Sequence, residues 1–298
     1  MSALVTAAIT TYNRAEFLDG ALDSVYAQTF DDYEVLVVDD GSTDETPEVL
    51  ARHADRIRVV SQSNGGRSAA RNRAVREARG RYVSFLDSDD RWLPDKLARQ
   101  VPVLEADDRV GMVHGHVEVV GPDGETRDDE TEEHRRLFSA AHADGVTYAG
   151  YAFDCRCFSS ALTARVAAIE DVGMYDPTLL LDDYDLYLRL ALAWRIVFLE
   201  GEPVARYRHH PGQMTTYELT QGQIQTAEKH LALIDQRPGI PDAQLARRNF
   251  LLMLARSHAV LGRQRDSRRD LVRALRLDPT LLVRQPWVAR RLLASALK

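Results

Sequence analysis

The sequence predicts an α/β fold, a mostly parallel sheet flanked by helices, followed by a C-terminal α-helical extension. Short apolar runs alternate with segments of helical spacing through the first hundred residues, a pattern typical of parallel strands covered by helices. Each of the first four predicted strands ends in a set of polar or charged residues. From about residue 218 the spacing becomes helical and stays so to the end of the chain.

The predicted elements alternate between strand and helix. The predicted strands of the first hundred residues are 4–10, 33–40, 56–62 and 82–87, and the helices between them include 15–28 and 67–79. Ser42 and Glu45 have the spacing of a capping box for the second helix, with Pro47 early in that helix. Residues 110–120 and the acidic stretch to about 134 predict a hairpin and a loose surface loop. Further strands and helices are predicted at 157–173, 175–194, 195–201 and 203–210.

The composition suits one large or two smaller globular domains. The chain has 298 residues, of which 45% are hydrophobic and 28% are charged, and no apolar run is long enough to span a membrane as a helix. The N-terminal residues lack a basic region and a cleavage site, so they predict a first strand rather than a signal peptide. Cys155 and Cys157 are the only cysteines, which favours a reducing cytoplasm over a disulfide framework.

The charge is divided unevenly along the chain. Residues 244–298 hold 13 Lys or Arg and 3 Asp or Glu, a net of +10, against −17 for the remainder. This basic segment, with its leucines and Trp287, predicts either contact with an anionic membrane surface or a solvated helical bundle or oligomer contact. Nucleic acid is excluded as a partner because the rest of the chain is acidic. Residues 254–279 resemble one tetratricopeptide unit, which should pack on the rest of the chain or on a partner.

The polar sets at the four strand ends are expected to meet. In a parallel sheet the carboxyl ends of the strands form one edge, and open sheets bind ligands outside that edge. The sequence therefore predicts one cleft, lined by residues 10–14, 39–40, 64–67 and 87–90.

The fourth strand ends in three carboxylates, Asp87, Asp89 and Asp90. Like charges this close resist ionising together unless a cation lies among them. An EF-hand loop is excluded, because Arg91 and Trp92 stand where a ligand and a glycine are needed. The chain has no suitable downstream lysine for a phosphatase with an aspartyl nucleophile. It also has no glycines directly after the first strand, which a dinucleotide-binding fold requires.

A divalent ion that carries a diphosphate explains the excess of negative charge better. Mg²⁺ or Mn²⁺ takes one or two carboxylates and completes its shell with phosphate oxygens and water. The sequence therefore predicts that such an ion bridges Asp87 or Asp89 to a diphosphate, with Arg71 and Arg67 as further sources of positive charge.

Five motifs together resemble family 2 glycosyltransferases with the GT-A fold. In chain order they are TTYNR, VVDDGSTD, NGGRSAARN, FLDSDD and LDDYDLYLR. The resemblance covers roughly residues 3–217 and implies a glycosyltransferase domain at 1–217. Within it, residues 1–109 would be the nucleotide-sugar half and 110–217 the acceptor and catalytic-base half. Residues 218–298 would form a basic helical extension.

The resemblance implies a nucleotide pocket at the first two strand ends. Tyr12 resembles the residue that stacks on the base, with Thr10 and Arg14 in the same pocket. Asp39 resembles the carboxylate that accepts a hydrogen bond from a uracil N–H, and Asp40 would support the ribose side or the turn. A UDP-sugar is therefore favoured, while dTDP- and GDP-sugars remain open.

The third and fourth motifs resemble the diphosphate and metal site of the family. Arg71 would lie near the diphosphate, and Asp87, Ser88 and Asp89 match the DxD element. Asp89 is assigned to direct contact with Mn²⁺ or Mg²⁺, and Asp87 to the ribose or a metal-bound water. Asp90 is expected to cap the next helix.

The last motif resembles the catalytic-base element, in which family members usually carry Glu-Asp. Here the pair is Asp182-Asp183, and Asp183 would be the base, with Asp185 in a structural role. A later histidine of the family contacts the metal or the diphosphate. Alignment favours His210 over His209 for that role.

The implied activity is an inverting, metal-dependent transfer of a sugar to an acceptor hydroxyl. The acceptor would be a carbohydrate or a lipid-linked molecule in surface polysaccharide, glycolipid or glycoprotein glycan assembly, in the cytoplasm or at the inner face of the membrane. Tyr151, Cys155 and Cys157 are candidates for the acceptor region. A nucleotidyltransferase and a non-catalytic nucleotide-sugar binder are the alternatives; the first should carry a glycine-rich basic loop after strand one, and the second should lack the base.

Overall fold

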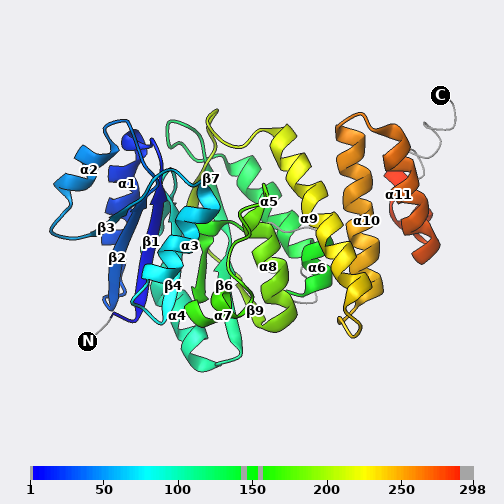
Figure 1. Cartoon of the computed structure of the whole chain (residues 1–298), viewed down its shortest axis with the longest axis horizontal. Coiled ribbons are helices and arrows are strands. Elements are labelled where there is room, and N and C mark those ends of the chain that lie inside the picture. The colour runs from blue at the N-terminus through cyan, green and yellow to red at the C-terminus, as the bar shows by residue number, and fades with distance from the viewer. Residues whose placement is uncertain (1–2, 142–145, 154–156, 289–298) are drawn as a thin grey trace.

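The computed structural model describes residues 3–141, 146–153 and 157–288. It confirms the predicted fold class, because a mostly parallel sheet is flanked by helices and further helices follow at the C-terminal end (Figure 1). In Figure 1 the blue strands of the sheet and the orange and red helices lie at opposite ends of the long axis.

The central sheet has seven strands in the order β3-β2-β1-β4-β8-β6-β9. In chain order they are β1 Val5–Thr11, β2 Tyr33–Asp39, β3 Arg58–Ser61, β4 Tyr82–Asp87, β6 Val110–Gly115, β8 Leu162–Arg165 and β9 Arg195–Leu199. Neighbouring strands are parallel except at β8, which runs antiparallel to β4 and β6. A smaller sheet has the order β5-β10-β7, formed by Arg91–Trp92, Ala205–Arg208 and Val117–Val120.

The carboxyl ends of the first four strands are aligned at one edge of the sheet. Thr11 pairs with Asp39, Asp39 pairs with Ser61, and Thr10 pairs with Asp87. This register confirms that the polar residues after these strands gather at one edge, as the alternation of strands and helices predicts.

The sheet has an apolar core on each face, because successive residues of a strand point to opposite sides. Ile9 and Val37 belong to one core and Ala8 and Val38 to the other, and all four are completely buried. The helices of the first core are α1 Ala15–Tyr26, α2 Thr46–Arg52 and α4 Lys96–Ala106. The second core includes α3 Arg67–Glu77, α7 Val166–Asp171 and α8 Asp182–Ala193.

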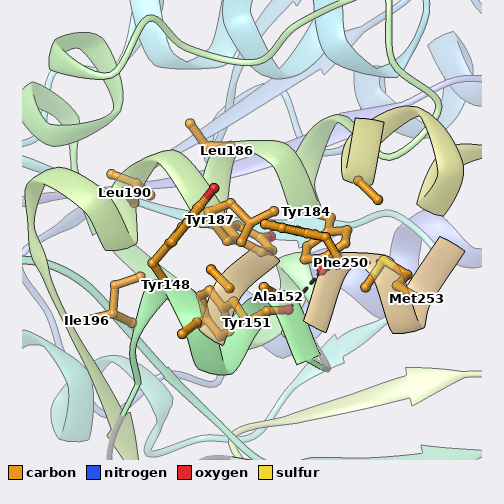
Figure 2. Close-up of a cluster of buried hydrophobic side chains, with 14 of the residues drawn as sticks. Tyr148, Tyr151, Ala152, Tyr184, Leu186, Tyr187, Leu190, Ile196, Phe250 and Met253 are labelled. Carbon is orange, nitrogen blue, oxygen red and sulfur yellow. Dashed lines mark hydrogen bonds between the residues drawn. The ribbon is translucent and has the colours of Figure 1, made fainter. Parts of the chain in front are cut away.

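The C-terminal helices extend the second core. They are α9 Thr216–Gln236, α10 Ala243–Val260, α11 Gln264–Leu277 and α12 Leu281–Arg284. Figure 2 shows Phe250 and Met253 of α10 beside Tyr151 of α6 (Tyr148–Phe153) and Tyr184 of α8. Within the tetratricopeptide-like segment, the Ser257 hydroxyl donates to Gln223 of α9 (2.9 Å), so this segment packs on the rest of the chain, which is one of the two arrangements predicted for it.

The outer side of the last helices stays exposed. It carries Val260, Leu277, Leu282 and Val283 as exposed apolar side chains. In the part of the chain that the structure describes, no helix combines the length and apolar character that crossing a bilayer requires. Contact of residues 244–298 with a membrane surface or a second chain stays a prediction.

Three local predictions are wrong. Strands β6 and β7 do not form a hairpin, because β6 joins the central sheet while β7 pairs with β10 in the smaller one. The expected loose loop contains helix α5, Asp128–Ala141, whose three acidic residues in the first turn suit the positive end of the helix dipole. Helix α2 has no capping box, because the Ser42 hydroxyl accepts a hydrogen bond from the Asn13 N–H instead (3.0 Å).

Candidate active site

A cleft of about 880 Å³ opens at the carboxyl edge of the sheet. Asp40, Arg67 and Cys157 line this cleft. Most of the predicted site residues line it as well: Thr10, Tyr12, Arg14, Arg71, Asp87, Ser88, Asp89 and Asp183. Tyr151 is completely buried behind the wall, and Cys155 lies outside the described residues. Burial raises the pKa of the Cys157 thiol, which favours its protonated form.

The end of the first strand contributes Tyr12 and Arg14 to the cleft. Tyr12 is 44% exposed, so its ring is available for stacking. The Arg14 guanidinium donates to the Gly212 carbonyl oxygen (3.2 Å) and lies 3.8 Å from Asp89 Oδ2. Arg14 therefore joins the loop after β10 to the carboxylates of the cleft.

The second strand places Asp40, not Asp39, on the cleft wall. Asp39 accepts a hydrogen bond from the Ser42 N–H (3.0 Å) and does not line the cleft. Asp40 accepts hydrogen bonds from the Gly65 and Gly66 N–H groups (2.9 and 2.8 Å). Adjacent residues at a strand end point in opposite directions, so only one of these two carboxylates faces the cleft. The contacts of Asp40 support the neighbouring turn, and the base-reading role of Asp39 stays a prediction for a residue that does not line the cleft.

The three carboxylates at the end of β4 have two kinds of surroundings. Asp87 and Asp89 face the cleft, whereas Asp90 is 2% exposed and points away from it. Asp90 accepts from the Ser160 hydroxyl (2.5 Å) and from the Arg208 N–H (2.9 Å). Burial next to Asp89 raises the pKa of Asp90. The predicted helix-capping role of Asp90 is wrong, because α4 begins at Lys96, six residues later, behind its N-cap residue Asp95. Asp90 instead joins the turn to two other segments.

Arg71 supplies the cation that the acidic cleft requires. Its side chain is 2% exposed, and its Nη2 donates to Asp87 Oδ1 (2.9 Å). Its Nη1 lies 3.7 Å from both Asp182 Oδ1 and Asp183 Oδ2. These carboxylates hold the pKa of Arg71 well above its ordinary value despite burial. Arg71 Nε and Nη1 are buried and have no hydrogen-bond partner among the described residues, so the guanidinium neutralises these carboxylates mainly through charge.

The LDDYDLYLR motif begins helix α8, and residues of helix α3 bind its first aspartate. Asp182 is completely buried and accepts hydrogen bonds from Arg67 Nη2 (2.7 Å) and the Ser68 hydroxyl (2.9 Å). Asp183 accepts from the Tyr184 N–H (2.8 Å), and its side chain remains 24% exposed to the cleft. Burial raises the pKa of Asp183, and Arg67 opposes that shift. Asp183 is therefore a fixed, accessible carboxylate whose basicity exceeds that of an ordinary aspartate.

The paired histidines after β10 have different surroundings. His210 Nε2 lies 3.0 Å from Asp89 Oδ2, and its side chain is 7% exposed. His209 is 53% exposed and contacts Glu130 on α5. Of the two, His210 has the position expected of a metal or diphosphate contact.

The potential metal ligands of the cleft suit an ion whose coordination shell is completed by a substrate. In the described ranges, no group of three or more His, Cys, Asp and Glu is arranged to hold an ion by itself. Asp89 and His210 meet at the cleft with Asp87 beside them, which gives one carboxylate, one imidazole and a nearby second carboxylate. Mg²⁺ and Mn²⁺ are commonly held by so few protein ligands when phosphate oxygens complete the shell.

The far wall of the cleft is formed by residues to which the sequence analysis assigned no role in the site. Phe153 of α6, Glu218, Leu219 and Gln223 of α9, and Met253 and Arg256 of α10 contribute to it. Sequence reasoning missed these residues because the helical spacing of the tail contains no signal for which turn meets the cleft.

Helix α9 also packs closely against the loop that precedes Asp183. A Cβ atom at Gly222 would lie 2.5 Å from Leu181 Cγ, so only glycine allows this close approach. Gln225 Oε1 accepts from the Leu180 N–H (3.1 Å), and His230 Nε2 lies 3.1 Å from Asp185 Oδ1. Asp185 also pairs with Arg189 and Lys229, which fits its predicted structural role. Positions 222, 225, 229 and 230 share one face of α9, so that face fixes the start of α8.

Solved structures share the fold of this chain. S. aureus TarS 1–349 superposes with a TM-score of 0.67 at 17% identity, over 98% of this chain and 88% of that one. The mannosyltransferase PcManGT from Pyrobaculum calidifontis, in complex with GDP-Man and Mn²⁺, gives 0.60 at 22% identity, over 100% and 87%. Both structures are similar enough to establish a glycosyltransferase-type GT-A fold.

The sequence comparison establishes the family. The model of glycosyl transferase family 2 matches residues 6–166, more than half of the chain, and the protein belongs to that family. A glycosyltransferase of Nostoc sp. (strain PCC 7120), itself uncharacterised, is 36% identical over 179 residues. That match covers 58% of this chain and 54% of the relative. The putative teichuronic acid biosynthesis glycosyltransferase TuaG of Bacillus subtilis (strain 168) is 41% identical over 105 residues, 34% of this chain and 42% of TuaG.

Gly222→Ala should impair transfer without weakening donor binding. The new Cβ collides with Leu181 and shifts the loop before Asp183, and displacements of about 1 Å can lower a rate roughly 100-fold. The measurement is kcat together with the donor Kd for Gly222→Ala and for Gln221→Ala, its neighbour on the same helix. An unchanged kcat in Gly222→Ala, or an equal loss of donor affinity, would contradict the positioning role of α9.

Proposed function

We propose that this protein is an inverting, metal-dependent glycosyltransferase that moves a sugar from a nucleotide-diphosphate sugar to an acceptor hydroxyl. The observation that carries the proposal is the arrangement around Arg71. Its guanidinium lies between Asp87 on the donor side and Asp183 at the start of α8, and all three residues line one cleft. The proposed diphosphate-binding and proton-accepting groups therefore meet at one guanidinium.

Asp183 is the proposed general base. Its Oδ1 accepts a hydrogen bond from the Tyr184 N–H, which fixes the carboxylate, while the side chain keeps access to the cleft. It takes the proton of the acceptor hydroxyl as that oxygen attacks the anomeric carbon from the face opposite the diphosphate. Because the attack and the departure are on opposite faces, the configuration at the anomeric carbon inverts.

The leaving diphosphate is an anion, and the cleft holds cations to receive it. The Nη1 atom of Arg71 lies among the carboxylates of the cleft and has no hydrogen-bond partner among the described residues. Arg14 lies beside Asp89. Asp89 and His210 would hold Mn²⁺ or Mg²⁺, with Asp87 beside them, and a bound ion would add Lewis-acid stabilisation of the leaving group. Preorganised charges of this kind stabilise the negative charge that develops in the transition state.

A uracil nucleotide is the proposed donor. The exposed Tyr12 ring offers a stacking surface, and Asp40 rather than Asp39 is the carboxylate on the adjacent wall. S. aureus TarS 1–349 has been solved in complex with UDP-GlcNAc, and PcManGT with GDP-Man and Mn²⁺. These neighbours support a nucleotide-sugar donor with a divalent metal, and they leave UDP, dTDP and GDP to be separated by experiment.

The proposed process is assembly of a cell-surface polysaccharide or another glycan. Its support is the sequence similarity to TuaG, whose name assigns it to teichuronic acid biosynthesis. This chain spans only part of such relatives, so the similarity supports the class of process rather than a particular polymer.

A sugar-nucleotide panel tests the donor and the metal. UDP-sugars should raise Tm more than GDP- or dTDP-sugars, and Mn²⁺ should increase that shift; saturation at 100 times Kd corresponds to about 2.7 kcal/mol. Asp89→Asn should reduce the part of the shift that depends on Mn²⁺. A larger shift with GDP-sugars would overturn the uracil assignment, and no shift with any sugar nucleotide would overturn the proposed function.

Asp183→Asn tests the base. The amide cannot accept the proton, so transfer should fall by about 10²–10⁴-fold while the donor-induced Tm shift remains. Asp235→Asn, at an exposed aspartate of α9 that does not line the cleft, is the matched control. Because burial raises the pKa of Asp183, the wild-type rate should decline on acidification above the ordinary aspartate value of about 3.9. Normal turnover by Asp183→Asn would exclude it as the base.

A further inference from the structure

Helix α11 is fixed to the protein by one face and exposed on the other. On its inner face, the Ser267 hydroxyl donates to the carbonyl oxygen of Ala255 in α10 (2.8 Å). Asp270 Oδ2 lies 3.0 Å from His258 Nδ1 of α10, and Leu271 is completely buried. In Figure 1 α11 lies beyond α10 as seen from the sheet, so its other face, called here the outer face, points away from the rest of the molecule.

The outer face of α11 is rich in arginine. Its members follow the spacing of one side of a helix, and all are exposed: Arg265, Arg268, Arg269, Val272 and Arg276. Arg269 forms ion pairs with Asp266 and Asp270. The other three arginines have no ion-pair partner among the residues that the structure describes. Three positive charges of this face are therefore available to an external partner.

Exposed aliphatic side chains accompany these arginines. Among the described residues eleven large apolar side chains are exposed, and five of them lie on α11 or in the segments that adjoin its two ends: Val260, Val272, Leu277, Leu282 and Val283. Val283 has the largest exposed fraction of all eleven, 84%. Aliphatic residues beside arginines suit the boundary between lipid headgroups and acyl chains. Surfaces that bind single-stranded nucleic acid instead offer aromatic rings on which bases stack.

The charge of this end of the molecule distinguishes between the partners that such a face could bind. A second copy bound through the same face would bring the arginines of two chains together, and like charges across an interface oppose association. An anionic bilayer offers negative charge to the arginines and an apolar layer to the aliphatic side chains. Residues 1–243 carry a net charge of −17, so the same bilayer would repel them and orient the basic end towards itself.

We propose that the outer face of α11, together with Val260, Leu282 and Val283, binds the anionic surface of a lipid bilayer. The arginines contact lipid phosphates, and the aliphatic side chains enter the headgroup layer. Because α10 contributes Met253 to the cleft and carries α11 on its other side, two packed helices connect the bilayer surface to the wall of the cleft. This inference concerns the place where the protein acts, and it does not depend on the proposed donor or base.

Vesicle sedimentation of the full chain tests the proposal. The protein is mixed either with vesicles of phosphatidylcholine alone or with vesicles that also contain phosphatidylglycerol. It should bind the anionic vesicles and leave the neutral ones unbound, and added NaCl should weaken the binding because salt screens exposed charges. Absence of binding to the anionic vesicles, or equal binding to both kinds, would overturn the proposal.

Variants locate the contact. Each arginine near an anionic surface strengthens binding about fivefold, so the combined change Arg265→Gln, Arg268→Gln and Arg276→Gln should weaken it roughly 100-fold. The double change Leu282→Ser and Val283→Ser should weaken it about tenfold, because less apolar area enters the bilayer. All five side chains are exposed, so Tm should stay at the wild-type value in both variants. Unchanged vesicle binding by either variant would contradict the proposed contact.

The matched control removes three positive charges elsewhere. Arg73, Arg76 and Arg79 are exposed arginines on α3 or just after it, and none of them lines the cleft. The combined change of these three to Gln should leave vesicle binding as in wild type, and a loss equal to that of the α11 variant would overturn the proposal. Sedimentation equilibrium without lipid tests the other partner. A stable dimer that the α11 variant dissociates would assign the face to a second chain and would overturn the proposal as well.

Discussion

The buried guanidinium of Arg71 is the interaction on which the rest of the site depends. It contacts Asp87 at the end of β4 and lies within 3.7 Å of Asp182 and Asp183 at the start of α8. Without a cation there, the low-dielectric surroundings would force these carboxylates to bind protons or move apart. Because Arg71 stands on α3, beneath the same edge of the sheet, it joins the donor half of the cleft to the half that carries the proposed base.

Neighbouring residues of α3 support this junction. Asn72 donates to the Tyr175 carbonyl oxygen (2.8 Å) and accepts from the Tyr175 N–H (2.9 Å), which fixes the loop before α8. Arg67 and Ser68 bind the Asp182 carboxylate, so that Asp183 alone of the pair remains available to the cleft. Helix α3 thus positions the loop before α8, neutralises the Asp182 carboxylate and leaves the Asp183 carboxylate accessible.

The C-terminal helices complete both the core and the cleft. Phe250 is completely buried in the same core as Tyr151 and Tyr184, so α10 packs as part of the body of the protein. Gly222 lets α9 approach the loop before Asp183, and Arg256 reaches the far wall of the cleft. A basic segment that looks separate in the sequence therefore shares its core and its cleft with the glycosyltransferase part of the chain.

The sequence predicted the features that follow from local pattern. Apolar runs and their polar ends predicted the parallel strands and the common edge, and the motif order predicted the family. Pattern alone could not tell Asp39 from Asp40, because a one-residue change at a strand end reverses the direction of the side chain. It also could not show that Asp90 bonds Ser160 and Arg208, or that Arg256 meets the cleft, since these contacts join distant segments.

The stability of Arg71→Met as a function of pH tests the central claim most directly. Removal of one partner from a buried ion pair typically costs about 3–5 kcal/mol, so the variant should be less stable than wild type by about that much at pH 7. Burial raises the pKa of Asp183 and Arg71 opposes that shift, so loss of the cation raises the native-state pKa of this carboxyl further. The deficit is therefore present at neutral pH and shrinks as the pH falls through that raised value. The measurement is urea unfolding of both proteins from pH 7 to pH 4. A deficit that shrinks on acidification is the predicted result, and one that is negligible at pH 7 or independent of pH would contradict the account.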